Sequence, residues 1–163
     1  MTSPALPLGS GPPAIDLSLP EAGNLPRVDR ERMLAMLPRL PALAASGRLL
    51  PMTAADARDG TIVGGGTLHH LDAERSIIEI GYWIFSHARR RGFGTRIARL
   101  LAEHAFGLGV VRVAAYVNVG NVASERVLEL VGFTREGVVR STPVPSGARL
   151  DTTLFSLLPG EGR

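Results

Sequence analysis

One segment of the chain has residue types and spacing that suit phosphate binding, the run Arg89-Arg90-Arg91-Gly92-Phe93-Gly94. A strand-like apolar segment precedes the run, and a helix-like segment follows it. Glycines let backbone N–H groups crowd inward, and the first turn of a helix directs its free N–H groups and positive dipole end at the same point. Arginine adds forked donors that match phosphate oxygens. The run therefore predicts a pyrophosphate-binding turn, with a solvated basic helix entry as the alternative.

Two common nucleotide-binding motifs are excluded. A Rossmann turn needs a third glycine, but position 97 is Ile. The triple glycine Gly64-Gly65-Gly66 is not followed by the Lys-Ser or Lys-Thr of a Walker site. Glycines inside a strand instead let another backbone approach closely or permit a bulge.

Glu79 is the candidate general base. It interrupts an apolar run, and strand alternation places it on the same face as Gly81 and Trp83. A carboxylate in the centre of a sheet must be paired or functional, because an unpaired buried charge is costly. A sheet face open to solvent, or an ion pair with a nearby arginine, is the alternative interpretation.

The histidines do not predict a metal site. His69 and His70 are adjacent, so on a strand we expect them to point to opposite faces, and His87 and His104 are isolated. The chain has no cysteine, which excludes a disulfide, a thiolate metal site and a cysteine nucleophile. The Gly-x-Ser-x-Gly elbow of a serine hydrolase is also missing.

The elements that must position these residues form an α/β fold, a mixed sheet flanked by helices. A Pro- and Gly-rich arm over residues 1–26, with a short strand near residues 14–19, precedes one domain over residues 27–163. A broken helix is expected from Asp29 to Gly47. The expected strands cover residues 49–54, 61–71, 76–85, 110–117, 133–140 and 150–158, and the later helices cover residues 95–108 and 121–132.

Composition narrows the classes of protein. All 18 basic residues are arginine, which keeps the pI near 10.5 although the net charge is only +3. The arginines are mostly scattered, which favours a GC-rich genome over a nucleic-acid surface. No apolar stretch is long enough to span a bilayer, and the N-terminus lacks the pattern of a signal peptide. We expect a soluble cytoplasmic protein, a monomer or a homodimer, with no membrane partner.

The motifs together resemble the GNAT superfamily of N-acetyltransferases. Arg89-x-x-Gly92-x-Gly94, after the strand Ile78–Ile84, is similar to the acyl-CoA signature of that superfamily. The run Asn121–Val127, followed by Gly132-Phe133, is similar to the second signature. The resemblance covers roughly residues 59–158 and is closest to the branch containing the ribosomal-protein N-terminal acetyltransferases.

The resemblance implies a mode of acetyl-CoA binding. The strand 79–85 would splay from the strand 110–117, and pantetheine would pair with the exposed backbone near Ile84, whose N–H would face the thioester oxygen. Ser124 would lie near the sulfur as the acid, or would be only a polar first-turn residue. Many relatives have a Tyr where this chain has Leu128. The implied cofactor-binding residues are Ile84, Arg89, Arg90, Arg91, Gly92, Phe93, Gly94, Thr95 and Asn121, the last of which would also serve as a helix N-cap.

The resemblance implies direct transfer of an acetyl group from acetyl-CoA to a primary amine. The acceptor stays open among a protein N-terminal α-amine, a small amine and an aminoglycoside-like drug. Two non-enzymatic alternatives remain: an acyl-CoA-binding module without catalysis, and a nucleic-acid- or ribosome-associated protein suggested by the high pI.

Overall fold

The computed structural model describes residues 15–16, 49–143 and 148–162. In these residues one sheet has the strand order β1-β2-β3-β4-β5-β7-β6. The first strands are β1 (Ile15–Asp16), β2 (Leu49–Ala55), β3 (Ile62–Asp72) and β4 (Ile77–Ile84). After them come the 3-10 turn η3 (Ser86–Ala88), helix α3 (Phe93–Gly107), β5 (Arg112–Asn118), helix α4 (Val122–Val131), β6 (Thr134–Pro143) and β7 (Arg149–Leu157).

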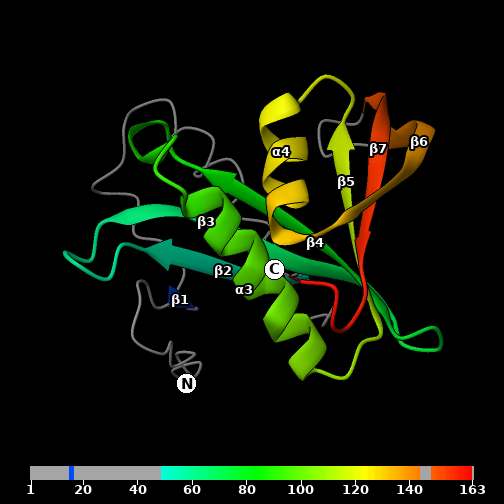
Figure 1. Cartoon of the computed structure of the whole chain (residues 1–163), viewed down its shortest axis with the longest axis horizontal. Coiled ribbons are helices and arrows are strands. Elements are labelled where there is room, and N and C mark those ends of the chain that lie inside the picture. Colours follow the sequence, from blue (N-terminus) through cyan, green and yellow to red (C-terminus); the bar gives the residue numbers. More distant parts are fainter. Residues whose placement is uncertain (1–14, 17–48, 144–147, 163) are drawn as a thin grey trace.

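Helix α3 is the crossover that allows β4 and β5 to run parallel, whereas every other pair of neighbouring strands is antiparallel. It contacts β3, β4, β5 and α4, and Figure 1 shows α3 and α4 together on one face of the sheet. Its apolar side chains, such as Ile97 and Leu101, pack in the same core as Ile78 and Ile80 of β4. The even-numbered residues of β4 therefore face the helices.

Strands β4 and β5 separate along their length. They pair only at Ile77–Arg112, Ile78–Val113 and Glu79–Ala114. Beyond this point β4 continues to Ile84 and β5 to Asn118, and the two strands diverge (Figure 1). At their carboxyl ends the two strands therefore no longer pair with each other, and an opening lies between them. Helices α3 and α4 begin near this opening.

The triple glycine in β3 is required by packing. A Cβ on Gly64 would collide with the carbonyl oxygen of Trp83, and one on Gly65 would collide with the carbonyl oxygen of Met52 and the indole of Trp83. On Gly66 it would meet the side chain of Leu101. The glycines therefore let neighbouring backbone and a helix side chain approach β3, which confirms the sequence interpretation.

The expected mixed sheet flanked by helices is confirmed, with shifts at particular ends. Helix α3 begins at Phe93 rather than at position 95, and β6 continues to Pro143, where a loop was expected from position 141. A short strand does form inside the expected range 14–19, as β1. The expected helix from Asp29 and the rest of the N-terminal arm lie outside the described residues.

Within the described ranges, no helix combines the length and the apolar character that crossing a bilayer requires.

Candidate active site

The segment that precedes α3 has the geometry of an anion-binding turn. Arg90 and Gly92 have φ angles of 58° and 80°. Gly92 is the N-cap of α3, it makes no side-chain capping bond, and the first turn of the helix contains no acidic residue. The N–H groups of the first turn and the positive end of the helix dipole are therefore available to a negatively charged group.

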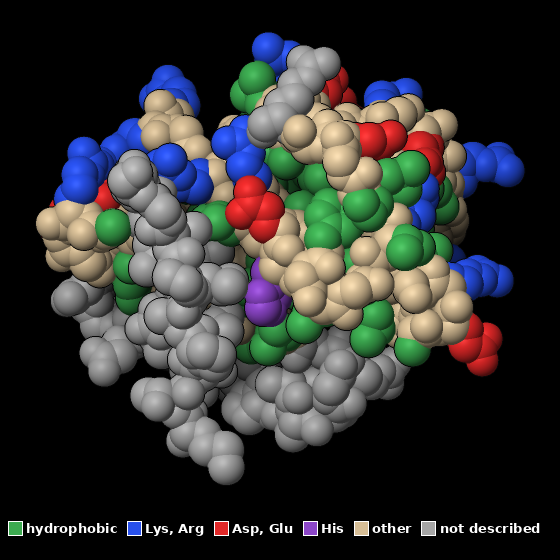
Figure 2. Space-filling model, turned by 60° about the horizontal axis from the view of Figure 1, so that its bottom comes forward, with side chains coloured by type: hydrophobic (Ala, Val, Ile, Leu, Met, Phe, Trp, Pro, Cys, Tyr) green, Lys and Arg blue, Asp and Glu red, His purple; other side chains and the backbone are tan. Residues whose placement is uncertain are grey.

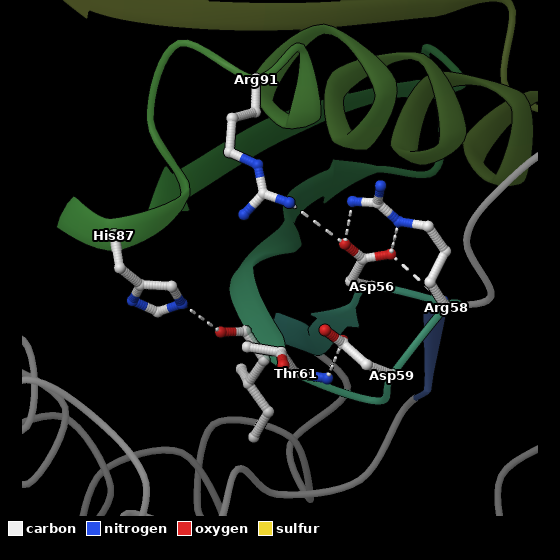
Figure 3. A network of polar contacts seen from close by, with 7 residues as sticks. Asp56, Arg58, Asp59, Thr61, His87 and Arg91 are labelled. Carbon is white, nitrogen blue, oxygen red and sulfur yellow. Dashed lines mark hydrogen bonds and ion pairs between the residues drawn. The ribbon is translucent and has the colours of Figure 1, made fainter.

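A polar network around Asp56 fastens this turn to the hairpin between β2 and β3 (Figure 3). The Asp56 carboxylate is buried and accepts bonds from Arg58 Nε at 3.0 Å and Arg58 NH2 at 2.6 Å. Arg91 NH2 lies 3.5 Å from the same carboxylate. The hydrogen bond from Arg58 lowers the pKa of Asp56 to about 2, so the group is ionised at neutral pH. A second contact joins His87 Nε2 to the carbonyl oxygen of Ile62 at 3.0 Å.

The three arginines of the turn take different positions. Arg91 is turned toward Asp56 (Figure 3) and its guanidinium carbon lies 5.1 Å from the centre of the Phe93 ring. Arg89 Nε donates to the carbonyl oxygen of Ile84 at 3.4 Å. Arg90 is exposed. Figure 2 shows basic side chains gathered at its upper left, the side where Figure 1 places this turn and the β2–β3 hairpin.

The next three residues belong to the first turn of α3. The Phe93 side chain is buried in the core, and Thr95 is half-buried. A Cβ on Gly94 would lie 3.2 Å from Val127 of α4 and 3.6 Å from Ile84 Cγ1. Gly94 therefore lets α3 pack closely against α4 and the end of β4, while Phe93 and Thr95 have backbone N–H groups in the turn.

The backbone of β4 faces the opening between β4 and β5 at alternate residues. The Phe85 N–H donates to the carbonyl oxygen of Val63 at 3.0 Å, which places odd-numbered N–H groups toward β3. By the two-residue alternation of a strand, the N–H groups of Tyr82 and Ile84 point toward β5, past the last β4–β5 pair. These two groups are available to an extended ligand lying in the opening.

Helix α4 brings Asn121 and Ser124 to the same opening. The Asn121 side chain caps the helix by accepting from the Ser124 N–H at 3.2 Å. The Tyr82 hydroxyl donates to the carbonyl oxygen of Ser124 at 3.1 Å. Burial raises the pKa of Tyr82 to about 12, although this hydrogen bond opposes the shift, so the phenol stays protonated. The half-buried Ser124 is therefore held both by its cap and by β4.

Glu79 lies at the closed end of the opening, where β4 and β5 last pair. Its carboxylate Oε2 is 2.8 Å from His70 Nδ1 and 3.5 Å from His69 Nε2. Burial acts to raise the pKa of Glu79, but the hydrogen bonds from both histidines outweigh it, and the pKa lies below its ordinary value. The expectation that His69 and His70 point to opposite faces is wrong, because a register shift follows His69 and breaks the alternation.

Glu79 and Ser124 lie on opposite faces of β4. Tyr82, which reaches Ser124, differs from Glu79 by an odd number of residues, so their side chains leave the strand on opposite sides. A strand rises about 3.3 Å per residue, so Glu79 and Ile84 are roughly 16 Å apart. The exposed Tyr116 of β5 lies close enough to Glu79 to be affected by its charge. Burial raises the pKa of Tyr116, and the negative charge of Glu79 raises it further.

The site therefore has two parts. One part is the opening between β4 and β5, which is called the slot below. Its open end is surrounded by backbone N–H groups of β4, the turn before α3 and the start of α4. A carboxylate with two imidazoles marks the closed end, on the other face of the sheet. A model of the acetyltransferase (GNAT) domain matches residues 25–134, two thirds of the chain.

The chain belongs to the GNAT acetyltransferase family.

Individual relatives agree with this assignment. The chain is 38% identical over 104 residues to the "Putative ribosomal N-acetyltransferase YdaF" of Bacillus subtilis, a match that covers 63% of this chain and 57% of YdaF. The structure of Mycobacterium smegmatis RimJ in complex with CoA-disulfide is 28% identical and superposes with a TM-score of 0.69, covering 81% of this chain and 63% of RimJ. This GNAT chain thus spans a little over half the length of YdaF.

A further solved structure supports the fold. A putative ribosomal-protein-serine acetyltransferase from Vibrio cholerae superposes with a TM-score of 0.78 over 90% of this chain and 93% of that protein, at 17% identity. The fold of this GNAT chain is therefore shared with a distant protein.

Sequence reasoning missed three features of the GNAT chain's site. It did not predict the bond from Tyr82 to α4, because that contact joins residues far apart in sequence. It did not predict the Asp56–Arg91 ion pair, although an aspartate just before a hairpin turn was visible. The two histidines were visible too, but only the bulge after His69 turns both toward Glu79.

Proposed function

We propose that this chain is an acetyl-CoA-dependent N-acetyltransferase that transfers the acetyl group directly to a primary amine. The observation that carries the proposal is the N-terminus of α3, where no side chain caps the free N–H groups. It lies beside the slot between β4 and β5, in a chain of the GNAT family. The turn over residues 89–95 would bind the pyrophosphate, and the slot would receive the pantetheine arm as an added strand. Direct transfer needs no covalent intermediate on the enzyme.

In this mechanism acetyl-CoA supplies an activated acyl group, and the chain supplies orientation and charge stabilisation. The Ile84 N–H points into the opening between β4 and β5 and would donate to the thioester oxygen as negative charge develops on it, while the Tyr82 N–H would pair with the pantetheine arm. Ser124 would donate to, or orient, the departing sulfur. The cap from Asn121 and the bond from Tyr82 hold the start of α4 in place for this role.

Glu79 would accept the proton that the attacking amine must lose. The face of β4 that carries Glu79 is the face away from α3 and α4, so the amine would approach the slot from the side opposite the cofactor turn. A carboxylate roughly 16 Å from Ile84 along the strand cannot contact the same acyl group directly. The proton would therefore pass to Glu79 through water, with Tyr116 bordering the path.

We favour a protein N-terminal α-amine as the acceptor, because the relative YdaF is named a putative ribosomal N-acetyltransferase. A small amine or an aminoglycoside is the alternative acceptor. Acetylation of N-terminal peptides, polyamines and aminoglycosides, measured side by side as release of free CoA, would separate them. Tight acetyl-CoA binding with no turnover on any acceptor would favour a non-catalytic binding module.

The proposed pyrophosphate-binding turn over residues 89–95 can be tested at Gly92, where an added Cβ would meet no atom within 4 Å. Gly92→Glu should abolish acetyl-CoA binding in isothermal titration, because it places a negative charge at the phosphate turn. Gly92→Asn is the matched control, since asparagine tolerates a left-handed backbone and adds no charge. Equal binding by Gly92→Glu and Gly92→Asn would overturn the assignment of this turn.

A further inference from the structure

A cluster of two imidazoles and one carboxylate lies on the face of the sheet away from α3 and α4. One ligand atom from each of His69, His70 and Glu79 lies within 4.8 Å of the others. His70 Nδ1 is 2.8 Å from Glu79 Oε2, and His69 Nε2 is 3.5 Å from the same oxygen. The two rings meet edge to face, with centroids 4.8 Å apart. Three ligand atoms thus converge on one point from two strands.

An irregularity in β3 makes this convergence possible. His69 pairs with Glu79, but the next registered pair is Asp72 with Ile77, so β3 has one residue more than β4 between the two pairs. His70 has a φ of 52°, in the left-handed region that a residue other than glycine rarely adopts. A regular strand would turn His70 to the opposite face. The bulge instead brings two successive histidines to one carboxylate.

The surroundings of His69 orient its ring. The buried hydroxyl Oγ1 of Thr67 lies 3.2 Å from His69 Nδ1, which leaves Nε2 directed at Glu79. A side chain at Gly81 would crowd both groups, since its Cβ would lie 3.0 Å from Thr67 Oγ1 and 3.4 Å from His69 Cε1. A polar partner on the far nitrogen is what metal-binding histidines usually have, because it fixes the tautomer and the ring orientation.

We propose that His69, His70 and Glu79 bind a first-row transition-metal ion, with Zn²⁺ as the best match. Two imidazoles and a carboxylate are a ligand set that zinc accepts, leaving a position for water. Tetrahedral zinc with bonds near 2.0 Å needs ligand atoms about 3.3 Å apart, so shifts of about 1 Å would close the cluster. The side chains are 23%, 64% and 25% exposed, which gives an ion a route of entry.

The cluster shares Glu79 with the proposed catalytic site. A bound ion would also engage the carboxylate that is the proposed proton acceptor for acetyl transfer. Zinc should then slow acetylation. This expected effect rests on the proposed function, whereas the proposal of a metal site does not.

The test is isothermal titration of the tag-free full chain with ZnCl₂, in the absence of acetyl-CoA, together with Co²⁺ absorption spectra. We expect one ion per chain and the intense visible bands of low-coordinate Co²⁺. His70→Asn removes the imidazole while tolerating the positive φ, and Glu79→Gln removes the charge. Each should weaken Zn²⁺ binding at least tenfold. Thr67→Val keeps all three ligands and should weaken binding by about tenfold through the orientation of His69.

His87→Ala and His104→Ala are the matched controls, because both histidines lie outside the cluster, and both variants should bind Zn²⁺ as the unmodified chain does. Circular dichroism would verify that each variant is folded. Failure of the unmodified chain to bind Zn²⁺ would overturn the metal site, and so would His70→Asn and Glu79→Gln variants that bind Zn²⁺ as tightly as the unmodified chain does. Because acetyl-CoA binding is measured separately, either result would leave the proposed acetyltransferase function standing.

Discussion

At the scale of single residues, Ser124 is held by its backbone, so its hydroxyl can be removed without disturbing the site. Its N–H donates to Asn121 and its carbonyl accepts from Tyr82, and neither bond involves the side-chain oxygen. The hydroxyl is thus available to act on a leaving group at the start of α4. A serine hydroxyl is a weak acid, so orientation of the thiolate is the larger part of its proposed contribution.

Ser124→Ala should therefore reduce kcat by about tenfold or more while changing acetyl-CoA affinity little. Steady-state kinetics and isothermal titration on the same preparation separate the two effects. Asn121→Ala is the informative companion, because loss of the cap should cost about 1 kcal/mol of stability and displace the start of α4. Unchanged kcat in Ser124→Ala would remove this residue from the catalytic site.

At the scale of elements, local patterns in the sequence were sufficient to predict most strands and helices. Apolar runs and turn residues predicted β3, β4 and α4, and Asn121 was expected to cap α4, as it does. They could not predict the bulge after His69, because the register of β3 depends on its pairing with β4. The turn before α3 was visible in the sequence, but the direction of the Arg91 side chain depends on Asp56, which lies in the hairpin between β2 and β3.

The close approach of β2, β3 and β4 at Gly65 predicts how substitutions there change the stability of the fold. Gly65→Ala should destabilise the fold by about 2 kcal/mol or more, because its Cβ would collide with the Met52 backbone and the Trp83 indole. Gly107→Ala is the matched control, since it ends α3 and its Cβ would meet no atom within 4 Å. We expect it to be neutral or to stabilise by up to about 1 kcal/mol. Thermal and urea unfolding would measure both.

Equal stability of Gly65→Ala and Gly107→Ala would contradict the close approach of the strands. A further consequence follows for the site, because Gly65 pairs with Trp83 of β4, beside Tyr82 and Ile84. Strain at Gly65 should therefore also weaken acetyl-CoA binding in protein that remains folded.

At the scale of the whole molecule, charged contacts tie together segments that are not paired with each other in the sheet. Arg112 of β5 makes two bonds to Glu136 of β6, at 2.8 Å and 2.6 Å, across the intervening strand β7. Ser156 of β7 donates to the same carboxylate at 2.7 Å. Asp56 plays the corresponding role near the other edge of the sheet, where it holds the turn before α3 against the β2–β3 hairpin.

These contacts predict how stability depends on pH. The hydrogen bond from Arg112, with that from Ser156, lowers the pKa of Glu136 from 4.5 to about 2, and the bond from Arg58 lowers that of Asp56 from 3.8 to about 2. A carboxyl group with a lower pKa in the folded state stabilises the fold above its unfolded pKa. That stabilisation is lost as the pH falls through the folded value. The free energy of unfolding should therefore decline between about pH 4.5 and about pH 2.

Glu136→Gln and Asp56→Asn should each lower stability at neutral pH and make this acid decline shallower. The two carboxylates lie in different parts of the sheet and share no partner, so their effects should add in the double variant. Urea unfolding at several pH values in this window would measure the slopes. If Glu136→Gln kept the slope of the unmodified chain, the Arg112–Glu136–Ser156 contact would not be formed in solution, and the junction of β5, β6 and β7 would depend on backbone pairing and apolar packing alone.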